Sequence, residues 1–207
     1  MDENFWDERY RERERIWSGQ PNGTLLVELP GPGRGTALDV GCGEGADAIW
    51  LAEQGWRVTG AELSSVALAR AEAEAKSRGL EITWLHADLS SVAPPRRYDL
   101  VVLHYFPLLK APGDPAAHRL LEAVAPGGTL LVVQHDVSQI DPNWHGGDER
   151  VPPIDRFYQP ADLAALLGEG WTTHVHETRP RVREAPAGSH HTHDTVLRAT
   201  RSAPPGP

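Results

Sequence analysis

The chain has 207 residues and a formal net charge of −9 at pH 7, and its 40% hydrophobic and 24% charged residues are ordinary for a globular protein. This length suits a single α/β domain with its own core, and no stretch approaches the roughly 20 apolar residues of a membrane helix. Basic residues are interleaved with acidic ones, as in residues 11–15, which disfavours a nucleic-acid partner because such proteins usually present a basic face. The single cysteine, Cys42, excludes an internal disulfide. Because the N-terminus is acidic and lacks an apolar signal segment, we expect a cytoplasmic protein.

The first thirty residues predict two helices. Residues 3–17 form the first, because one face repeats at steps of four, three and four residues: Trp6, Tyr10, Arg13 and Trp17. The break at residues 18–23 ends it, and a short apolar helix at residues 24–29 follows. The aromatic face can pack on the body of the protein, cover a bound ligand, or do both.

Strand and helix patterns then alternate along the chain. The predicted strands are residues 36–40, 57–61, 82–85, 98–104, 129–134, 172–178 and 195–200. The predicted helices are residues 44–54, 65–78, 115–124 and 160–167, with Ser64 as the N-cap of the second of these. This alternation predicts a mostly parallel sheet with helices on both faces.

A glycine-rich turn follows the first predicted strand. Gly41, Gly43 and Gly45 stand at alternate positions between that strand and the next helix, with Asp39 just before them. Glycines suit a sharp turn where a ligand lies against bare backbone, and the helix start carries a partial positive charge. Glu62 ends the second strand, where a carboxylate can accept hydrogen bonds from both ribose hydroxyls. The turn alone is a weak signal, because dinucleotide-binding folds also use one.

Four motifs in order resemble those of the class I S-adenosylmethionine (SAM)-dependent methyltransferases. They are residues 39–45 (the glycine turn), 58–64 (the acidic ribose-binding motif), 86–89 (the acid that meets adenine) and 125–130 (the Pro-Gly-Gly turn). The resemblance implies a Rossmann-like, seven-stranded sheet of order 3-2-1-4-5-7-6 whose seventh strand is antiparallel. It implies SAM as cofactor and S-adenosylhomocysteine (SAH) as product. The segment at residues 17–22 also resembles small bacterial methyltransferases related to the tellurite, thiopurine and halide enzymes, in which an N-terminal aromatic helix can close over the cofactor.

The resemblance also implies a cofactor site. Its residues are Asp39, Gly41, Cys42, Gly43, Gly45, Glu62, Leu63, Asp88, Leu89, His104 and Trp17. Cys42 is interpreted as a small residue that fills a tight loop, not as a nucleophile. Glu62 and Asp88 have a simpler alternative interpretation as solvated carboxylates at strand ends.

Two histidines end neighbouring strands of the implied sheet. His104 ends the fourth strand and His135 follows the fifth. Ligands of open α/β sheets bind at this carboxyl edge, and a neutral histidine suits proton removal near pH 7. We therefore expect His104, and after it His135, to be the general base for methyl transfer.

The last predicted hairpin brings more histidines toward the same edge. Its loop, residues 180–192, carries His190 and His191 and leads into His193, which we expect to approach His135. Together with Asp136 or Asp194, several histidines could hold zinc or iron, although adjacent histidines are not a typical ligand spacing. The simpler alternative is a solvated hairpin, and we predict no metal site.

The predicted function is methyl transfer from SAM to a small molecule. The fourth strand ends in His-Tyr-Phe-Pro at residues 104–107, not in the Asn-Pro-Pro-Tyr typical of amino-group methylation of bases and glutamine. A nicotinamide-dependent oxidoreductase is disfavoured because Gly-x-Gly-x-x-Gly is missing. A metal-assisted methyltransferase and a non-catalytic SAM-binding protein stay open as alternatives.

We expect no nucleic-acid or membrane partner and a monomer or weak homodimer. Residues 1–201 form one domain, with a helical lid at 1–30, a substrate-side insert at 136–159 and a disordered tail at 202–207.

Overall fold

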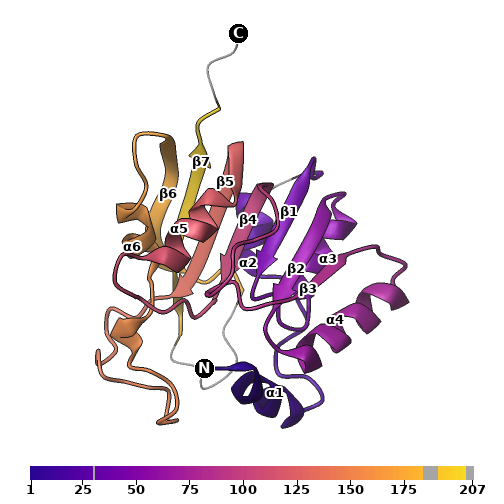
Figure 1. The fold of residues 1–207 in the computed structure, drawn as a ribbon, viewed down its shortest axis with the longest axis horizontal. Helices are drawn as coiled ribbons and strands as arrows, with labels where there is room; N and C mark the ends of the chain where they lie inside the picture. Colours follow the sequence, from indigo (N-terminus) through magenta and orange to yellow (C-terminus); the bar gives the residue numbers. More distant parts are fainter. Residues whose placement is uncertain (30, 184–190, 204–207) are drawn as a thin grey trace.

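The structure, a computed structural model, describes residues 1–29, 31–183 and 191–203, and in them one seven-stranded sheet organises the chain. The sheet order is β3-β2-β1-β4-β5-β7-β6, and β7 runs antiparallel to both of its neighbours, as predicted (Figure 1). The strands are β1 Thr36–Val40, β2 Arg57–Glu62, β3 Thr83–His86, β4 Tyr98–His104, β5 Val124–His135, β6 Trp171–Pro180 and β7 His193–Arg201.

Helices cover both faces of the sheet. They are α1 Glu3–Arg11, α2 Gly23–Glu28, α3 Ala46–Glu53, α4 Ser65–Ser77, α5 Pro115–Glu122 and α6 Pro160–Ala165, with a short 3-10 helix, η1, at Ile154–Arg156. Side chains of α2 and α3 pack in a core cluster on one face, and those of α5 and α6 pack in a second cluster on the other. Among the described residues, no helix is long and apolar enough to cross a membrane.

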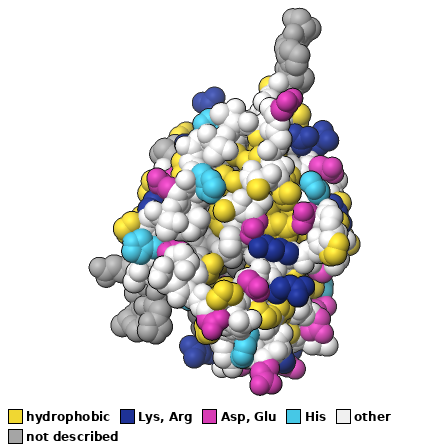
Figure 2. Space-filling model, turned by 90° about the vertical axis from the view of Figure 1, so that its left-hand side faces the viewer, with side chains coloured by type: hydrophobic (Ala, Val, Ile, Leu, Met, Phe, Trp, Pro, Cys, Tyr) yellow, Lys and Arg dark blue, Asp and Glu magenta, His cyan; other side chains and the backbone are white. Residues whose placement is uncertain are grey.

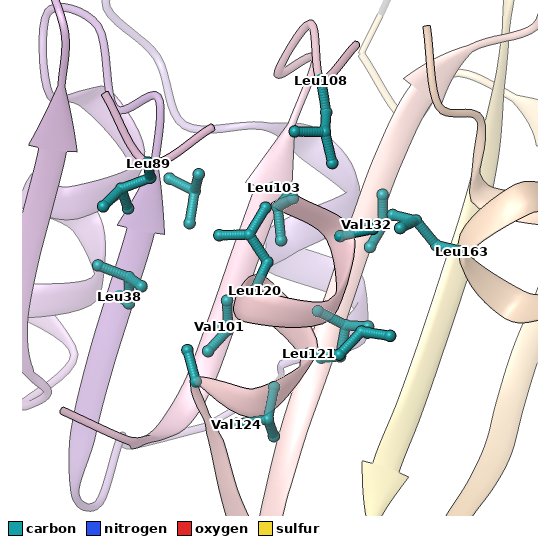
Figure 3. Packing of buried hydrophobic residues seen from close by; sticks show 14 of the residues in the cluster. Leu38, Leu89, Val101, Leu103, Leu108, Leu120, Leu121, Val124, Val132 and Leu163 are labelled. Carbon is teal, nitrogen blue, oxygen red and sulfur yellow. The ribbon is translucent and has the colours of Figure 1, made fainter. Parts of the chain in front are cut away.

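The central strands are buried on both faces, which explains their nearly continuous apolar sequence. In β1, Leu38 and Val40 face the α5 side, whereas Ala37 faces the α3 side. Figure 3 shows the α5-side cluster, in which strand side chains meet Leu120 and Leu121 of α5 and Leu163 of α6. Burying one such leucine contributes about 1.5–3 kcal/mol, so this cluster stabilises the packing of α5 and α6 on the sheet.

The N-terminal helix is shorter than predicted. It ends at Arg11, so the expectation of a helix through Trp17 is wrong. The backbone N–H groups of Ile16 and Trp17 donate to Glu44 Oε2 at 3.2 Å, and Arg70 Nη2 donates to backbone carbonyls of the same segment. These long-range partners take the place of helical hydrogen bonds.

Helix α1 lies beyond the carboxyl ends of the parallel strands, next to the start of α4 (Figure 1). Asp7 makes this contact, because its carboxylate accepts hydrogen bonds from Ser64 Oγ at 2.6 Å and Ser65 Oγ at 3.1 Å. Ser64 caps α4, as predicted, by accepting the N–H of Ala67. The N-terminal segment is therefore packed on the body of the protein.

The segment after β5 also packs at this edge. Tyr158 is buried, its N–H donates to the Leu108 carbonyl at 2.8 Å, and its hydroxyl donates to Asp114. The expected insert at 136–159 is thus attached to the loop that follows β4. Of the predicted disordered tail, Ser202 is described and donates its N–H to Gly170 O at 2.8 Å, whereas residues 204–207 lie outside the described residues.

The outer surface mixes charges. On the side of the edge strand β6, acidic and basic side chains lie interspersed with hydrophobic and histidine side chains (Figure 2). Seven of the ten residues of β6 are exposed, and this strand has one neighbour in the sheet. The charge interleaving in the sequence is therefore also present on this face.

Candidate active site

The glycine turn leaves β1 with the geometry that its sequence predicts. Gly41, Gly43 and Gly45 have φ angles of 70°, 53° and 82°, in the left-handed region that side chains disfavour. A Cβ on Gly41 would lie 2.5 Å from the Phe106 ring, and a Cβ on Gly43 would lie 2.9 Å from Tyr10 Oη. The turn therefore needs bare backbone at both positions, and it presents that backbone to the carboxyl edge of the sheet.

Glu62 fastens this turn to the end of β2. Its buried carboxylate accepts the N–H groups of Gly43 at 3.0 Å, Leu63 at 2.8 Å and Ser64 at 2.8 Å. Burial raises the pKa of Glu62, and these hydrogen bonds partly offset that effect. A carboxylate has about four lone-pair sites, so Glu62 keeps capacity for a further donor.

Asp39, which precedes the turn, and Cys42, which belongs to it, are both buried. One of the carboxylate oxygens of Asp39 has no hydrogen-bond partner, and burial together with the charge of Asp47 raises the pKa of Asp39 well above the ordinary value. Burial likewise raises the pKa of the Cys42 thiol, so a thiolate nucleophile is disfavoured. Cys42 thus has the properties of a packing residue.

Asp88 stands beyond the end of β3 and stabilises its own turn. Its carboxylate accepts the Ser90 N–H at 2.9 Å and hydroxyl hydrogen bonds from Ser90 and Ser91. Partial burial acts to raise the pKa of Asp88, but these hydrogen bonds outweigh it and lower the pKa. Leu89, which follows, is buried in the α5-side core, so the backbone here is firmly held.

Two aromatic residues of the N-terminal segment stand over the turn. Trp17 Nε1 donates to Tyr10 Oη at 3.2 Å, and both side chains face Gly43. Tyr10 is buried, whereas Trp17 is 52% exposed. The predicted cofactor residue Trp17 therefore does lie at the glycine turn.

His104 ends β4 with a nearly buried side chain, 4% exposed. Its Nδ1 lies 2.6 Å from Asp47 Oδ2, and Asp47 Oδ1 in turn accepts the Asn22 N–H at 2.6 Å. The Nε2 atom is buried and has no hydrogen-bond partner. Sequence reasoning missed Asp47; its place in the first turn of the helix after the glycines was the available signal.

His135, at the end of β5, is 30% exposed and belongs to a ring stack. Tyr105 stacks on one side with ring centroids 4.1 Å apart, and His191 stacks with centroids 4.2 Å apart. We predicted that His193 would approach His135, but the ring that stacks on it is that of His191. In β7 the residue paired with His135 is Asp194, and successive side chains alternate between faces.

The histidines at this edge are only partly gathered. His104 bonds to α3, whereas His135 stacks with Tyr105 and His191. Within residues 1–29, 31–183 and 191–203, no group of three or more histidine, cysteine or acidic side chains is placed to hold a metal ion. His190 lies outside the described residues.

Comparison with known proteins decides the family. The sequence model of a family described as a methyltransferase domain matches residues 37–128. The 2-heptyl-1-hydroxyquinolin-4(1H)-one methyltransferase of Mycobacteroides abscessus is 32% identical over 164 residues, which cover 75% of this chain and 68% of that protein. The chain belongs to the class I SAM-dependent methyltransferases.

Solved structures of similar fold agree with this assignment. A protein solved in work on the conversion of a disulfide bond into a thioacetal group during echinomycin biosynthesis has a TM-score of 0.73 at 25% identity, covering 97% of this chain and 91% of that one. The N-methyltransferase NodS of Bradyrhizobium japonicum, in complex with SAH, has a TM-score of 0.68 at 19% identity and covers 97% and 99%. SAM is the cofactor of this methyltransferase, and the bare glycine turn and the remaining lone pair of Glu62 fit it. The likeness to the tellurite and thiopurine subgroup stays a prediction.

Proposed function

We propose that this methyltransferase transfers the methyl group of SAM to an oxygen, nitrogen or sulfur atom of a small molecule, with a histidine as general base. The observation that carries the proposal is the position of His104 and His135 at one edge of the sheet. They end the neighbouring strands β4 and β5, beside the strand that ends in the glycine turn. Parallel α/β sheets bind their ligands at this edge.

The cofactor residues would act mainly by positioning. The backbone of the glycine turn and the carboxylate of Glu62 would hold the SAM ribose and its neighbouring atoms, and Asp88 with Leu89 would receive the adenine. When bound, SAM supplies a methyl group that its sulfonium already activates. The protein then needs to hold donor and acceptor in line and to exclude water.

We propose that residues 1–17 act as a lid over this site. Tyr10 and Trp17 face Gly43, and Glu44 binds the backbone of residues 16 and 17. Arg70 bridges the same segment to Glu44 at 2.9 Å. These contacts would have to loosen and re-form when the cofactor enters and leaves.

His104 is supported as a base by its contact with Asp47. An ionised carboxylate only accepts hydrogen bonds, so a neutral His104 would carry its proton on Nδ1 and keep the lone pair on Nε2. His135 is supported by its exposure at the edge. In either case the acceptor proton passes to an imidazole nitrogen as the acceptor lone pair attacks the methyl carbon.

The proposed acceptor is a planar, partly apolar molecule with a hydroxyl or thiol group. Aromatic side chains line the edge above β4 and β5, because Tyr105 and Phe106 follow β4 directly. The relative from Mycobacteroides abscessus is named for a hydroxyquinolone. That compound and a panel of phenols and thiophenols are therefore the first acceptors to test.

The experiment combines cofactor binding with methyl transfer. Calorimetric titration with SAM and SAH, before and after chelator treatment, is followed by transfer of a labelled methyl group to the acceptor panel. Transfer to at least one acceptor supports the proposal. Binding without transfer to any acceptor would favour the non-catalytic alternative, and binding only with metal would favour the metal-assisted one.

Histidine variants then assign the base. His104→Gln or His135→Gln should lower kcat by about 10²- to 10⁴-fold with little change in SAM affinity. His174→Gln is the matched control, because His174 is exposed on β6 and bonds to Thr200 Oγ1. Equal loss of SAM binding and turnover in His104→Gln would show that His104 only shapes the cofactor pocket.

A further inference from the structure

A buried carboxylate stands at the acceptor edge without a role in the proposed function. Asp194, the second residue of β7, is 2% exposed. Its two oxygens accept hydrogen bonds from Tyr105 Oη at 3.0 Å each, and Arg181 Nε lies 3.6 Å from Oδ1. The same oxygen lies 3.5 Å from His135 Nδ1. Three side chains from three segments of the chain thus converge on one carboxylate.

The ring stack determines which part of His135 a ligand can reach. Tyr105 stacks on the ring with an interplanar angle of 24°, and His191 stacks with an angle of 12°. With stacking partners on the ring, a ligand can best meet His135 at its edge, through a ring nitrogen. Nδ1 is buried and directed to Asp194. Nε2 is therefore the nitrogen left for a ligand at the edge of the sheet.

Tyr105 adopts a strained backbone conformation that serves this arrangement. Its φ is 53°, one of two positive values at non-glycine positions among the described residues. A left-handed conformation costs a non-glycine residue roughly 1–3 kcal/mol and persists only where the surroundings hold it. Here it directs the ring onto His135 and the hydroxyl onto Asp194, with the Arg181 guanidinium 5.6 Å from the ring centre.

We propose that Asp194 is a positioning residue that orients His135 as the proton acceptor of methyl transfer. This inference rests on the proposed function and commits it to His135 on the acceptor side. Asp194 holds the proton of neutral His135 on Nδ1, so that the Nε2 lone pair faces the acceptor. Arg181 compensates the buried charge, and Tyr105 fixes the carboxylate. The 3.5 Å contact is longer than a hydrogen bond, and such contacts tighten when a substrate binds.

The chemical step is balanced without a further reactant. The acceptor O–H or S–H gives its proton to His135 Nε2, and the acceptor lone pair forms the bond to the methyl carbon. The methyl–sulfur bond breaks, and its electron pair stays on sulfur. The products are the methylated acceptor, SAH and protonated His135, which returns its proton to water.

The first test reads the tautomer of His135 and needs no turnover. Long-range ¹H–¹⁵N correlation spectra of the SAH-bound protein with labelled histidine should show His135 protonated at Nδ1. Asp194→Asn should abolish this preference, and the charge-matched control Glu177→Gln, at an exposed site on β6, should keep it. An Nε2-protonated His135 in the wild type, or an unchanged tautomer in Asp194→Asn, would overturn the proposal.

The second test separates positioning from structure by choice of acceptor. With 4-methoxyphenol, Asp194→Asn should lower kcat by about tenfold to a hundredfold, the range found when the carboxylate partner of a metal-ligating histidine is removed. With 4-nitrophenol, which is largely ionised at pH 8, the same variant should keep wild-type kcat. Equal losses with both acceptors would refute the positioning role. If the wild type methylates no acceptor, the proposed function fails, and the tautomer still decides the role of Asp194.

Discussion

Alanine at position 43 should disrupt the glycine turn in two separable ways. The first is the backbone, because φ at Gly43 is 53° and a left-handed alanine costs about 1–2 kcal/mol. The second is contact, because the new Cβ would lie 2.9 Å from Tyr10 Oη and 3.6 Å from Trp17 Nε1. Moving the hydroxyl weakens its hydrogen bond to Trp17, which is worth about 0.5–1.5 kcal/mol. The expected loss in the free energy of unfolding is therefore about 1.5–3.5 kcal/mol.

Gly79→Ala is the matched control for this substitution. Gly79 has φ of 68°, and a Cβ there would meet nothing within 4 Å, so alanine carries the backbone cost alone. For a chain of this size each kcal/mol shifts Tm by about 2–4 °C. Calorimetry should therefore find a larger fall in Tm for Gly43→Ala than for Gly79→Ala. SAM affinity should fall at least about tenfold, or 1.4 kcal/mol, in Gly43→Ala only. Equal Tm losses with wild-type SAM affinity in both variants would refute the view that the glycine turn binds SAM through its bare backbone.

Three further predictions test other parts of the molecule. Burial raises the pKa of Asp39, so the stability that its protonated carboxyl contributes is lost as the pH rises from near 3.8 through the raised pKa. Urea unfolding should therefore find that Asp39→Asn gains stability relative to wild type toward neutral pH; a difference that stays constant with pH contradicts this. Glu44→Gln should expose residues 1–17 to limited proteolysis and speed SAM release, because it weakens two backbone hydrogen bonds and the ion pair with Arg70. Glu53→Gln is the control, and unchanged protection from proteolysis in Glu44→Gln would speak against a lid held by Glu44. Leu120→Ala should lower the free energy of unfolding by about 2–5 kcal/mol in urea unfolding, without changing the SAM affinity of the folded protein. A loss below about 1 kcal/mol, which is half the lower bound, would contradict the packing of α5.

Much of the fold was predictable because the central strands and the turns that flank them carry local signals. The span of β1 and that of β4 match the prediction, since buried parallel strands read as apolar runs bounded by turn residues. The errors lie where contacts with residues distant in the sequence determine the ends of helices and strands. Strand β5 begins at Val124, earlier than predicted, because Val124 pairs with Tyr98 before the Pro-Gly-Gly turn. Helix α1 ends early because Glu44 and Arg70 hold the chain that follows it.

The proposed cofactor half of the site has stronger local sequence signals than the proposed acceptor half. The glycine turn follows β1 directly and Glu62 is the last residue of β2, and because these two strands are neighbours, both features lie close together. The contact between His104 and Asp47 joins residues 57 positions apart, and that between Tyr105 and Asp194 joins residues 89 apart. Such pairs depend on sheet register and on the twist of Tyr105 into a left-handed conformation, and neither has a local sequence signal.

The reversed direction of β7 separates the two proposed halves of the site. Parallel strands bring only their last residues to the carboxyl edge, but antiparallel β7 brings its first residues there, opposite the end of β5. Asp194 therefore meets His135 at a place separated from β1 and the glycine turn by β4 and β5. Substitutions at the start of β7 would therefore alter the proposed acceptor side while the hydrogen bonds of Glu62 and the backbone of the glycine turn stay in place.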